Sequence, residues 1–141
     1  MSVSVPVLAQ ADLVVVGGAA GGVAAAAEAA RGGRRVFLGA AQPYLGEDIC
    51  AAGNFWLPED VEPEAPLARA LFLDDAGRRR AFVPPLHVKR RLDEELLAAG
   101  VRFLLGCLPA DLLLDREGGL AGVLFSGKCG LFAVTARQVV D

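Results

Sequence analysis

The fold of this chain is decided by one stretch of sequence, LVVVGGAAGGVAAAAEAAR at residues 13–31. Its first four residues are an unbroken apolar run that ends at glycine, which is typical of a strand buried on both faces of a parallel sheet. A glycine-rich turn follows, and residues 23–31 are almost entirely alanine, the best helix former. Residues 36–38 then indicate a second buried strand. Strand, turn, helix and strand together predict a βαβ unit over residues 12–40.

The chain downstream of this unit alternates between irregular and regular segments. Residues 41–68 carry four prolines and a cluster of acids, which predicts a long functional loop with one short helix near residues 67–72. Residues 86–105 show one apolar helical face followed by a buried strand. Short apolar runs separated by glycine-rich turns predict an antiparallel β-meander over residues 108–135. Residues 137–141 start a returning strand.

The predicted fold is α/β, a Rossmann-like βαβ parallel sheet with an inserted antiparallel β-meander. The chain has 141 residues, and its 54% hydrophobic content excludes disorder as the main state. A net charge of −3 gives no basic field for a nucleic-acid backbone. One histidine and three separated cysteines are too few ligands for a metal site. No apolar run is long enough to span a membrane, so we expect a cytoplasmic protein.

The glycine turn matches a dinucleotide-binding fingerprint with one departure. Gly17 permits the sharp turn, and Gly22 lets the helix lie close to the strand. The middle glycine, which normally leaves space for a pyrophosphate, is Ala19 here. The phosphates would sit on the N–H groups that open the alanine-rich helix, where the helix dipole favours an anion. The candidate phosphate-binding residues are Gly17, Gly18, Ala19, Ala20, Gly21 and Gly22.

A second departure concerns the acid that usually binds a ribose about 20 residues further on. Residues 39–41 are glycine and alanine, so no acid ends the second strand. Gln42 could supply a neutral hydrogen bond instead, and the nearest acids are Glu47 and Asp48. A purely structural interpretation also stands, in which the glycines only make a tight junction between helix and strand.

These residues resemble the N-terminal part of the FAD-dependent oxidoreductases of the glutathione-reductase-like, two-dinucleotide-binding superfamily. Residues 12–25 resemble the N-terminal FAD motif, and residues 44–50 resemble the loop that leads toward the flavin. Residues 87–101 resemble the helix and strand before the meander, and residues 135–141 resemble the strand that enters a later flavin-binding motif.

The resemblance implies FAD as the cofactor, with the flavin performing hydride or electron transfer. It places residues 41–68 on the flavin side, with Gln42, Gly46, Glu47 and Cys50 along the ribityl and isoalloxazine groups. No catalytic residue can be assigned. Two alternatives remain open: a non-catalytic Rossmann-like subunit that has lost dinucleotide binding, and an NAD(P)-binding module.

The resemblance also implies that the enzyme is incomplete in residues 1–141, because family members continue for several hundred residues. A doubly wound sheet needs helices on both faces, yet only two long helices are predicted, at residues 20–31 and 86–99. We therefore expect a hetero-oligomer, in which a second polypeptide covers a large apolar face and supplies the site for a small-molecule substrate.

Several reactive or charged residues allow more than one interpretation. Cys50 could be a redox thiol or a covalent flavin anchor, but a small packed residue is the favoured interpretation. His87 could be an acid–base group, although helix capping or loop packing is favoured. Residues 78–80 are three arginines, which could form a basic patch; a solvated turn before a strand at residues 82–83 is favoured. Cys107 and Cys129 are expected to be structural.

Overall fold

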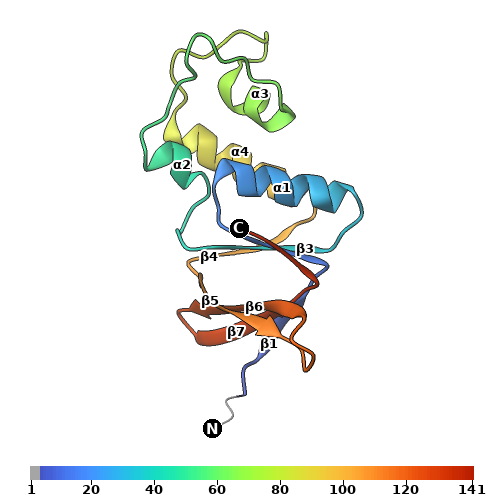
Figure 1. The fold of residues 1–141 in the computed structure, drawn as a ribbon. Helices are drawn as coiled ribbons and strands as arrows, with labels where there is room; N and C mark the ends of the chain where they lie inside the picture. The colour runs from blue at the N-terminus through green and yellow to red at the C-terminus, as the bar shows by residue number, and fades with distance from the viewer. Residues whose placement is uncertain (1–3) are drawn as a thin grey trace.

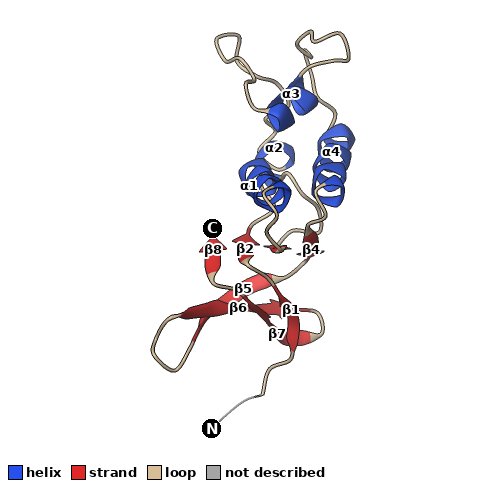
Figure 2. Cartoon of the chain, turned by 90° about the vertical axis from the view of Figure 1, so that its right-hand side faces the viewer, coloured by secondary structure: helices blue, strands red, loops and turns tan. Residues whose placement is uncertain are grey.

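The centre of the molecule is a four-stranded parallel sheet, seen edge-on between a helical layer and a second sheet in Figures 1 and 2. The computed structural model describes residues 4–141. The strand order of this sheet is β4-β3-β2-β8, and each neighbouring pair is parallel. Its strands are β2 (Leu13–Val16), β3 (Val36–Ala40), β4 (Arg102–Leu105) and β8 (Gln138–Val140). The predicted α/β class and parallel sheet are confirmed.

The second sheet contains the predicted meander and one strand that the sequence did not indicate. Its order is β1-β7-β6-β5, with antiparallel pairing of β5 with β6 and of β6 with β7. The unexpected member, β1, precedes the βαβ unit and pairs in parallel with β7. The strands are β1 (Val7–Gln10), β5 (Leu108–Leu114), β6 (Leu120–Gly127) and β7 (Gly130–Thr135).

All four helices lie on the opposite side of the parallel sheet from the meander (Figure 1). The long helices α1 and α4 pack on the sheet and on each other, and the short helices α2 and α3 lie beyond them (Figure 2). The helices are α1 (Ala20–Arg31), α2 (Glu47–Cys50), α3 (Pro66–Phe72) and α4 (Pro85–Ala98). The predicted long helices and the predicted short helix near residue 67 are confirmed.

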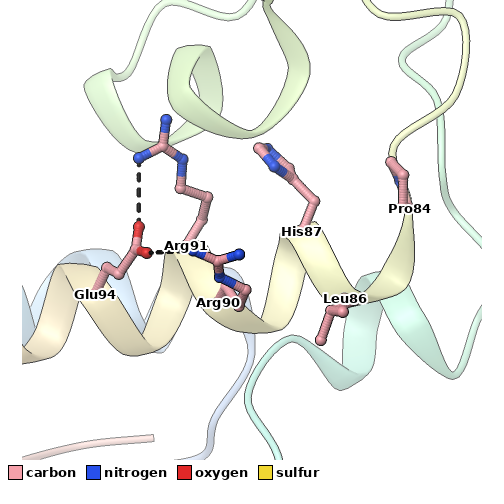
Figure 3. A pocket seen from close by; sticks show the side chains of 6 residues that line it. All are labelled: Pro84, Leu86, His87, Arg90, Arg91 and Glu94. Carbon is pink, nitrogen blue, oxygen red and sulfur yellow. Dashed lines mark hydrogen bonds and ion pairs between the residues drawn. The ribbon is translucent and has the colours of Figure 1, made fainter.

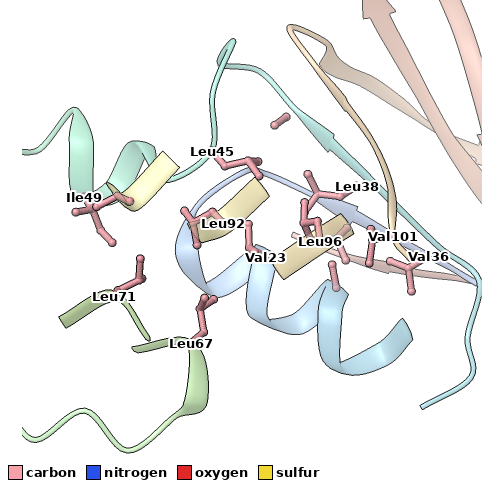
Figure 4. Close-up of a cluster of buried hydrophobic side chains, with 14 of the residues drawn as sticks. Val23, Val36, Leu38, Leu45, Ile49, Leu67, Leu71, Leu92, Leu96 and Val101 are labelled. Atoms are coloured by element: carbon pink, nitrogen blue, oxygen red, sulfur yellow. The ribbon is translucent and has the colours of Figure 1, made fainter. Parts of the chain in front are cut away.

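A larger hydrophobic core fills the space between the helices and the parallel sheet (Figure 4). Leu92 and Leu96 of α4 and Val23 of α1 are fully buried there against Leu38 of β3. Residues of the long connection join the same core through Leu45 and α3. The prolines of residues 41–68 therefore do not prevent this segment from packing, because Leu45 and Leu67 are buried in the core, although Trp56 and Val61 stay exposed.

The other face of the parallel sheet is covered by the meander, which corrects the expectation that this chain leaves the layer unfilled. Phe125 of β6 is fully buried and packs on Phe37 of β3, with their ring centroids 6.0 Å apart. The fit is tight, because an ideal Cβ built on Gly39 would lie 2.5 Å from Cε1 of Phe125. An antiparallel sheet thus covers the face of the parallel sheet that helices cover in a doubly wound fold.

The predicted strand at residues 82–83 is wrong, and the predicted solvated turn holds for the exposed Arg78 but not for Arg79. Phe82 and Val83 have no strand conformation; Val83 donates its N–H to the carbonyl of Phe55, 2.7 Å away. Arg79 reaches back to the long loop and donates to the carbonyls of Pro58 (2.5 Å) and Val61 (2.6 Å). Its guanidinium thereby holds a loop that has few apolar contacts of its own.

Candidate functional site

The glycine turn lies at the carboxyl end of β2, between the parallel sheet and the first turn of α1. Gly17 has a φ of +107°, a conformation that glycine adopts without strain, and its N–H donates to the carbonyl of Gly39 at 2.8 Å. This bond fastens the start of the turn to the end of the neighbouring strand. The sharp turn predicted at Gly17 is confirmed.

Gly22 is the point where α1 comes closest to the turn. A Cβ built on Gly22 would lie 2.8 Å from the carbonyl oxygen of Gly17, and no real Cβ approaches backbone that closely. A Cβ on Gly18 would meet Ala40 and Leu45 at 2.9 and 3.0 Å. By contrast, a Cβ on Gly21 would have no neighbour within 4 Å. The close approach of helix and strand predicted at Gly22 is confirmed, while Gly21 faces open space.

The first turn of α1 has no capping side chain of its own. The N-cap residue is Ala19, in an extended conformation (φ −66°, ψ 160°). The cap comes from α2 instead, because the carboxylate of Asp48 accepts the N–H of Ala20 at 3.1 Å through Oδ1 and 3.2 Å through Oδ2. An anion of the protein itself therefore stands at the positive end of the helix.

The loop before α2 is fixed against the glycine turn. Gly46 donates its N–H to the carbonyl of Gly18 at 2.7 Å and has a φ of +82°. A Cβ on Gly46 would lie 2.7 Å from Cδ1 of Leu92 and 2.9 Å from Cγ1 of Val88, so only glycine fits between this loop and α4. Of the predicted flavin-side residues, Gly46 and its neighbour Glu47 are thus brought beside the turn.

Gln42, just after the end of β3, is directed toward the edge strand β4. Gln42 is exposed, and its carbonyl accepts the N–H of Gly106, just beyond the edge strand β4. Ala40, at the end of β3, is almost fully buried against the glycine turn. The place where a ribose-binding acid is expected therefore presents a methyl group, as the sequence indicates.

Cys50 is half-buried at the end of α2, with its Sγ atom 3.7 Å from the carbonyl oxygen of Pro85. Burial raises the pKa of the thiol; Lys89 opposes this rise and Asp48 adds to it. A thiol with a raised pKa is protonated at neutral pH, and the thiolate is the reactive form. These surroundings favour the interpretation of Cys50 as a packed residue.

His87 lies in a cavity of about 460 Å³ on the α3 side of α4 (Figure 3). Its Nε2 atom is 3.3 Å from the carbonyl oxygen of Ala70, so the ring links α4 to α3. Arg90 and Arg91 both pair with Glu94, at 3.5 and 3.3 Å. These contacts favour the packing interpretation of His87 over an acid–base role. The lining residues are Pro84, Leu86, His87, Arg90, Arg91 and Glu94.

A smaller cavity of about 220 Å³ opens beside the first turn of α1. Its walls come from α1, α2 and α3 and are almost entirely apolar. The lining residues are Ala20, Gly21, Ala24, Ile49, Ala65, Leu67, Ala68, Leu71 and Phe72. Gly21 and Ala20 therefore border space, which agrees with the absence of neighbours around Gly21.

Two kinds of feature are absent from the described residues, 4–141. No helix there combines the length and the apolar character that crossing a bilayer requires. No three histidine, cysteine, aspartate or glutamate side chains gather there in a way that could hold a metal ion.

Asp48 is the residue of this site whose role the sequence did not indicate. It is separated from Ala20 by 28 positions, so no local pattern links the two. The only signal was indirect: an alanine at the N-cap position of α1 predicts that the helix start must find its cap elsewhere.

Comparison with known proteins places this geometry in context. The sequence matches a family described as FAD dependent oxidoreductase over residues 12–141. No curated protein sequence matches the chain. The fold is similar to that of 3-ketosteroid-delta4-(5alpha)-dehydrogenase from Rhodococcus jostii, with a TM-score of 0.67 and 18% identity, over 95% of this chain and 46% of that chain.

Two further solved structures are similar. THI4 from Thermovibrio ammonificans gives a TM-score of 0.61 at 15% identity, over 94% of this chain and 57% of that chain. The myxobacterial chondrochloren halogenase CndH, a variant of FAD-dependent halogenases, gives 0.62 at 22% identity, over 94% of this chain and 37% of that chain. At these identities the likeness shows the fold alone, and this chain spans about half the length of the first two proteins.

The family match covers nearly the whole described chain and includes the glycine turn, α1, the loop to α2, α4 and the meander. The two similar structures share the fold over 95% and 94% of this chain. The chain therefore belongs to the FAD dependent oxidoreductase family, whose cofactor is FAD.

Proposed function

We propose that this chain holds the pyrophosphate of FAD at the glycine turn and the first turn of α1, as the N-terminal portion of a flavin-dependent oxidoreductase. The observation that carries the proposal is the packing around the glycine turn. The helix start is pressed against the turn at Gly22, while the space beside Gly21 is open. Both features suit a site that brings backbone N–H groups close to a ligand.

The residues present fit a phosphate group. The N–H groups of Ala20, Gly21 and Gly22 open the helix, where they have no partner one turn earlier. The N–H of Ala20 already binds an anion, the carboxylate of Asp48, which stands where a phosphate oxygen would. Ala19 adds one methyl group beside this position.

The roles of the remaining site residues follow from their places in the fold. Gly46 and Glu47 lie beside the turn, where they would hold the ribityl side of a bound FAD, and Cys50 lies at the end of the same short helix. Gln42 would supply a neutral hydrogen bond to a ribose hydroxyl in place of the missing acid. FAD, when bound, supplies the hydride or electron transfer, and the protein orients it.

The substrate site belongs to the remainder of the enzyme. The chain covers 46% of one similar structure and 57% of another. We propose that a second polypeptide supplies the small-molecule site and further flavin contacts, which members of the resembled superfamily carry further along their own chain. Support comes from the outer strands of the second sheet, which expose Leu108, Leu112 and Leu114 on β5 and Val7 and Leu8 on β1.

A second candidate function is a subunit that keeps the fold but no longer binds a dinucleotide. The buried methyl group of Ala40 in place of an acid favours it, because a ribose would find no carboxylate there. The carboxylate of Asp48 at the helix start favours it too. An NAD(P)-binding module is less well supported, since the family match is to FAD enzymes.

The test is a titration of the purified chain with FAD, followed by flavin fluorescence and by the visible absorption of the protein after gel filtration. We expect saturable quenching and a yellow protein. The matched control is Gly22→Val, which should abolish both signals by wedging α1 from the turn. A wild-type chain that stays colourless and takes up no FAD would favour the second candidate. Full occupancy in Gly22→Val would show that the turn is not the phosphate site.

A further inference from the structure

One charged side chain occupies the very N–H group that a phosphate would need. Both carboxylate oxygens of Asp48 lie within 3.2 Å of the N–H of Ala20, the first residue of α1. We propose that Asp48 is an internal anion that competes with the phosphates of the dinucleotide for the start of α1. The inference rests on the proposed function and adds to it a residue that sets the affinity of the site.

Electrostatics makes the two anions mutually exclusive. A helix start carries a partial positive charge and a few free N–H groups, which suit one anion. A carboxylate left in place beside a pyrophosphate would be a like charge at close range, and the two would repel each other. Binding therefore requires the Asp48 carboxylate to leave Ala20.

The structure allows this movement without unfolding the loop. The backbone of Asp48 is held by α2: its carbonyl accepts the side-chain N–H of Asn54 at 3.1 Å, and Gly46 anchors the loop to Gly18. The side chain of Asp48 itself is exposed. A rotation of the side chain into water is thus sufficient, and the glycine turn stays intact.

The unliganded chain gains from the same contact. Because Ala19 offers no cap, the Asp48 carboxylate is what satisfies the first N–H of α1. Asp48 therefore stabilises the empty protein and weakens the complex. A residue that only supported the fold would stabilise the protein without ligand but would not weaken the complex.

The experiment compares wild type with Asp48→Ala, Asp48→Asn and the charge-matched control Asp60→Asn, which alters an exposed loop carboxylate. FAD and, separately, inorganic pyrophosphate are titrated by calorimetry, and the melting temperature of each unliganded chain is measured. We expect both Asp48 variants to bind FAD and pyrophosphate about tenfold more tightly than wild type. Asp48→Ala should melt several degrees lower without ligand, whereas Asp60→Asn should match wild type in both measurements.

The outcomes separate the two proposals. Equal or weaker binding of both ligands by the Asp48 variants would overturn the role of Asp48. Failure of every variant to bind FAD would overturn the proposed function, and the pyrophosphate titration would then decide the inference alone. In that case tighter pyrophosphate binding by Asp48→Asn supports competition at α1, and unchanged or absent binding overturns it.

Discussion

Two adjacent glycines in the first turn of α1 meet opposite surroundings. A methyl group on Gly22 would collide with the carbonyl of Gly17, whereas a methyl group on Gly21 would meet open space. We expect Gly22→Ala to lower the free energy of unfolding by about 1–3 kcal/mol. Gly21→Ala should raise it by about 0.5–1 kcal/mol, because alanine loses less chain entropy in a helix. Denaturant titration of both variants measures the difference, and equal effects would contradict the close approach at Gly22.

Cys50 and Cys129 differ in exposure and should differ in reactivity. Burial raises the pKa of the Cys50 thiol, whereas Cys129 is exposed. We expect iodoacetamide at neutral pH to modify Cys129 first and Cys50 slowly, since the thiolate is the nucleophile. Mass spectrometry of digests follows each site.

In the flavin-loaded protein, Cys50→Ser should leave FAD as extractable as it is in wild type. Flavin that stays with the denatured wild-type chain but not with the variant would show a covalent link.

Asp12 precedes β2 and makes the stability of the sheet sensitive to acid. Hydrogen bonds from the side chain and backbone of Arg35 lower the pKa of this carboxyl to about 2. A lowered pKa stabilises the folded state above the unfolded value of about 4, and this contribution is lost as the pH falls through about 2. The melting temperature of Asp12→Asn should therefore fall less between pH 4 and pH 2 than that of wild type. If the melting temperature of Asp12→Asn fell as much between pH 4 and pH 2 as that of wild type, this role would be refuted. Asp60→Asn serves as the control.

At the scale of elements, the contact between the two sheets depends on one glycine and one aromatic ring. A Cβ on Gly39 would lie 2.5 Å from Cε1 of Phe125, so Gly39→Ala should cost about 1–3 kcal/mol of stability by overpacking. Phe125→Leu alone should also destabilise, because it leaves a cavity. The double variant should be less destabilised than the sum, by about 0.5–3 kcal/mol. Additive effects in the double-mutant cycle would mean that this contact does not join the layers.

The sequence predicts the regular elements well and the contacts between distant elements poorly. The apolar run at residues 13–16, the alanine helix and the glycine turn carry their conformation locally, so they could be read in advance. The strand at residues 7–10 could not, because its partner is β7 and only that pairing makes it a strand. The strand predicted at residues 82–83 was wrong for the opposite reason. Two apolar residues suggest a strand, but no strand of the described residues lies beside them to pair with. Asp48 belongs to the same class, since its partner lies 28 positions away.

At the scale of the whole molecule, exposed apolar side chains remain on the outer strands of the second sheet and in the long loop. Leu114 is 62% exposed and Trp56 is 59% exposed. We expect the functional enzyme to bury such surfaces against the proposed second polypeptide, over more than about 2,000 Å². Native mass spectrometry of the flavin-loaded protein measures the assembly. A 14.6 kDa monomer that turns over its flavin with no second polypeptide bound would contradict this expectation.

The pairing of β1 with β7 and of β2 with β8 has a consequence for how the chain folds. β1 pairs with β7, and β2, which also pairs with β3, pairs with β8, so each sheet joins residues 7–16 to residues 130–140. Neither sheet contains all of its strands during synthesis until residues 130–140 have left the ribosome. Such long-range pairing slows folding to the millisecond-to-second range. We expect the helices, which depend on local contacts, to form before these long-range strand pairs complete the two sheets.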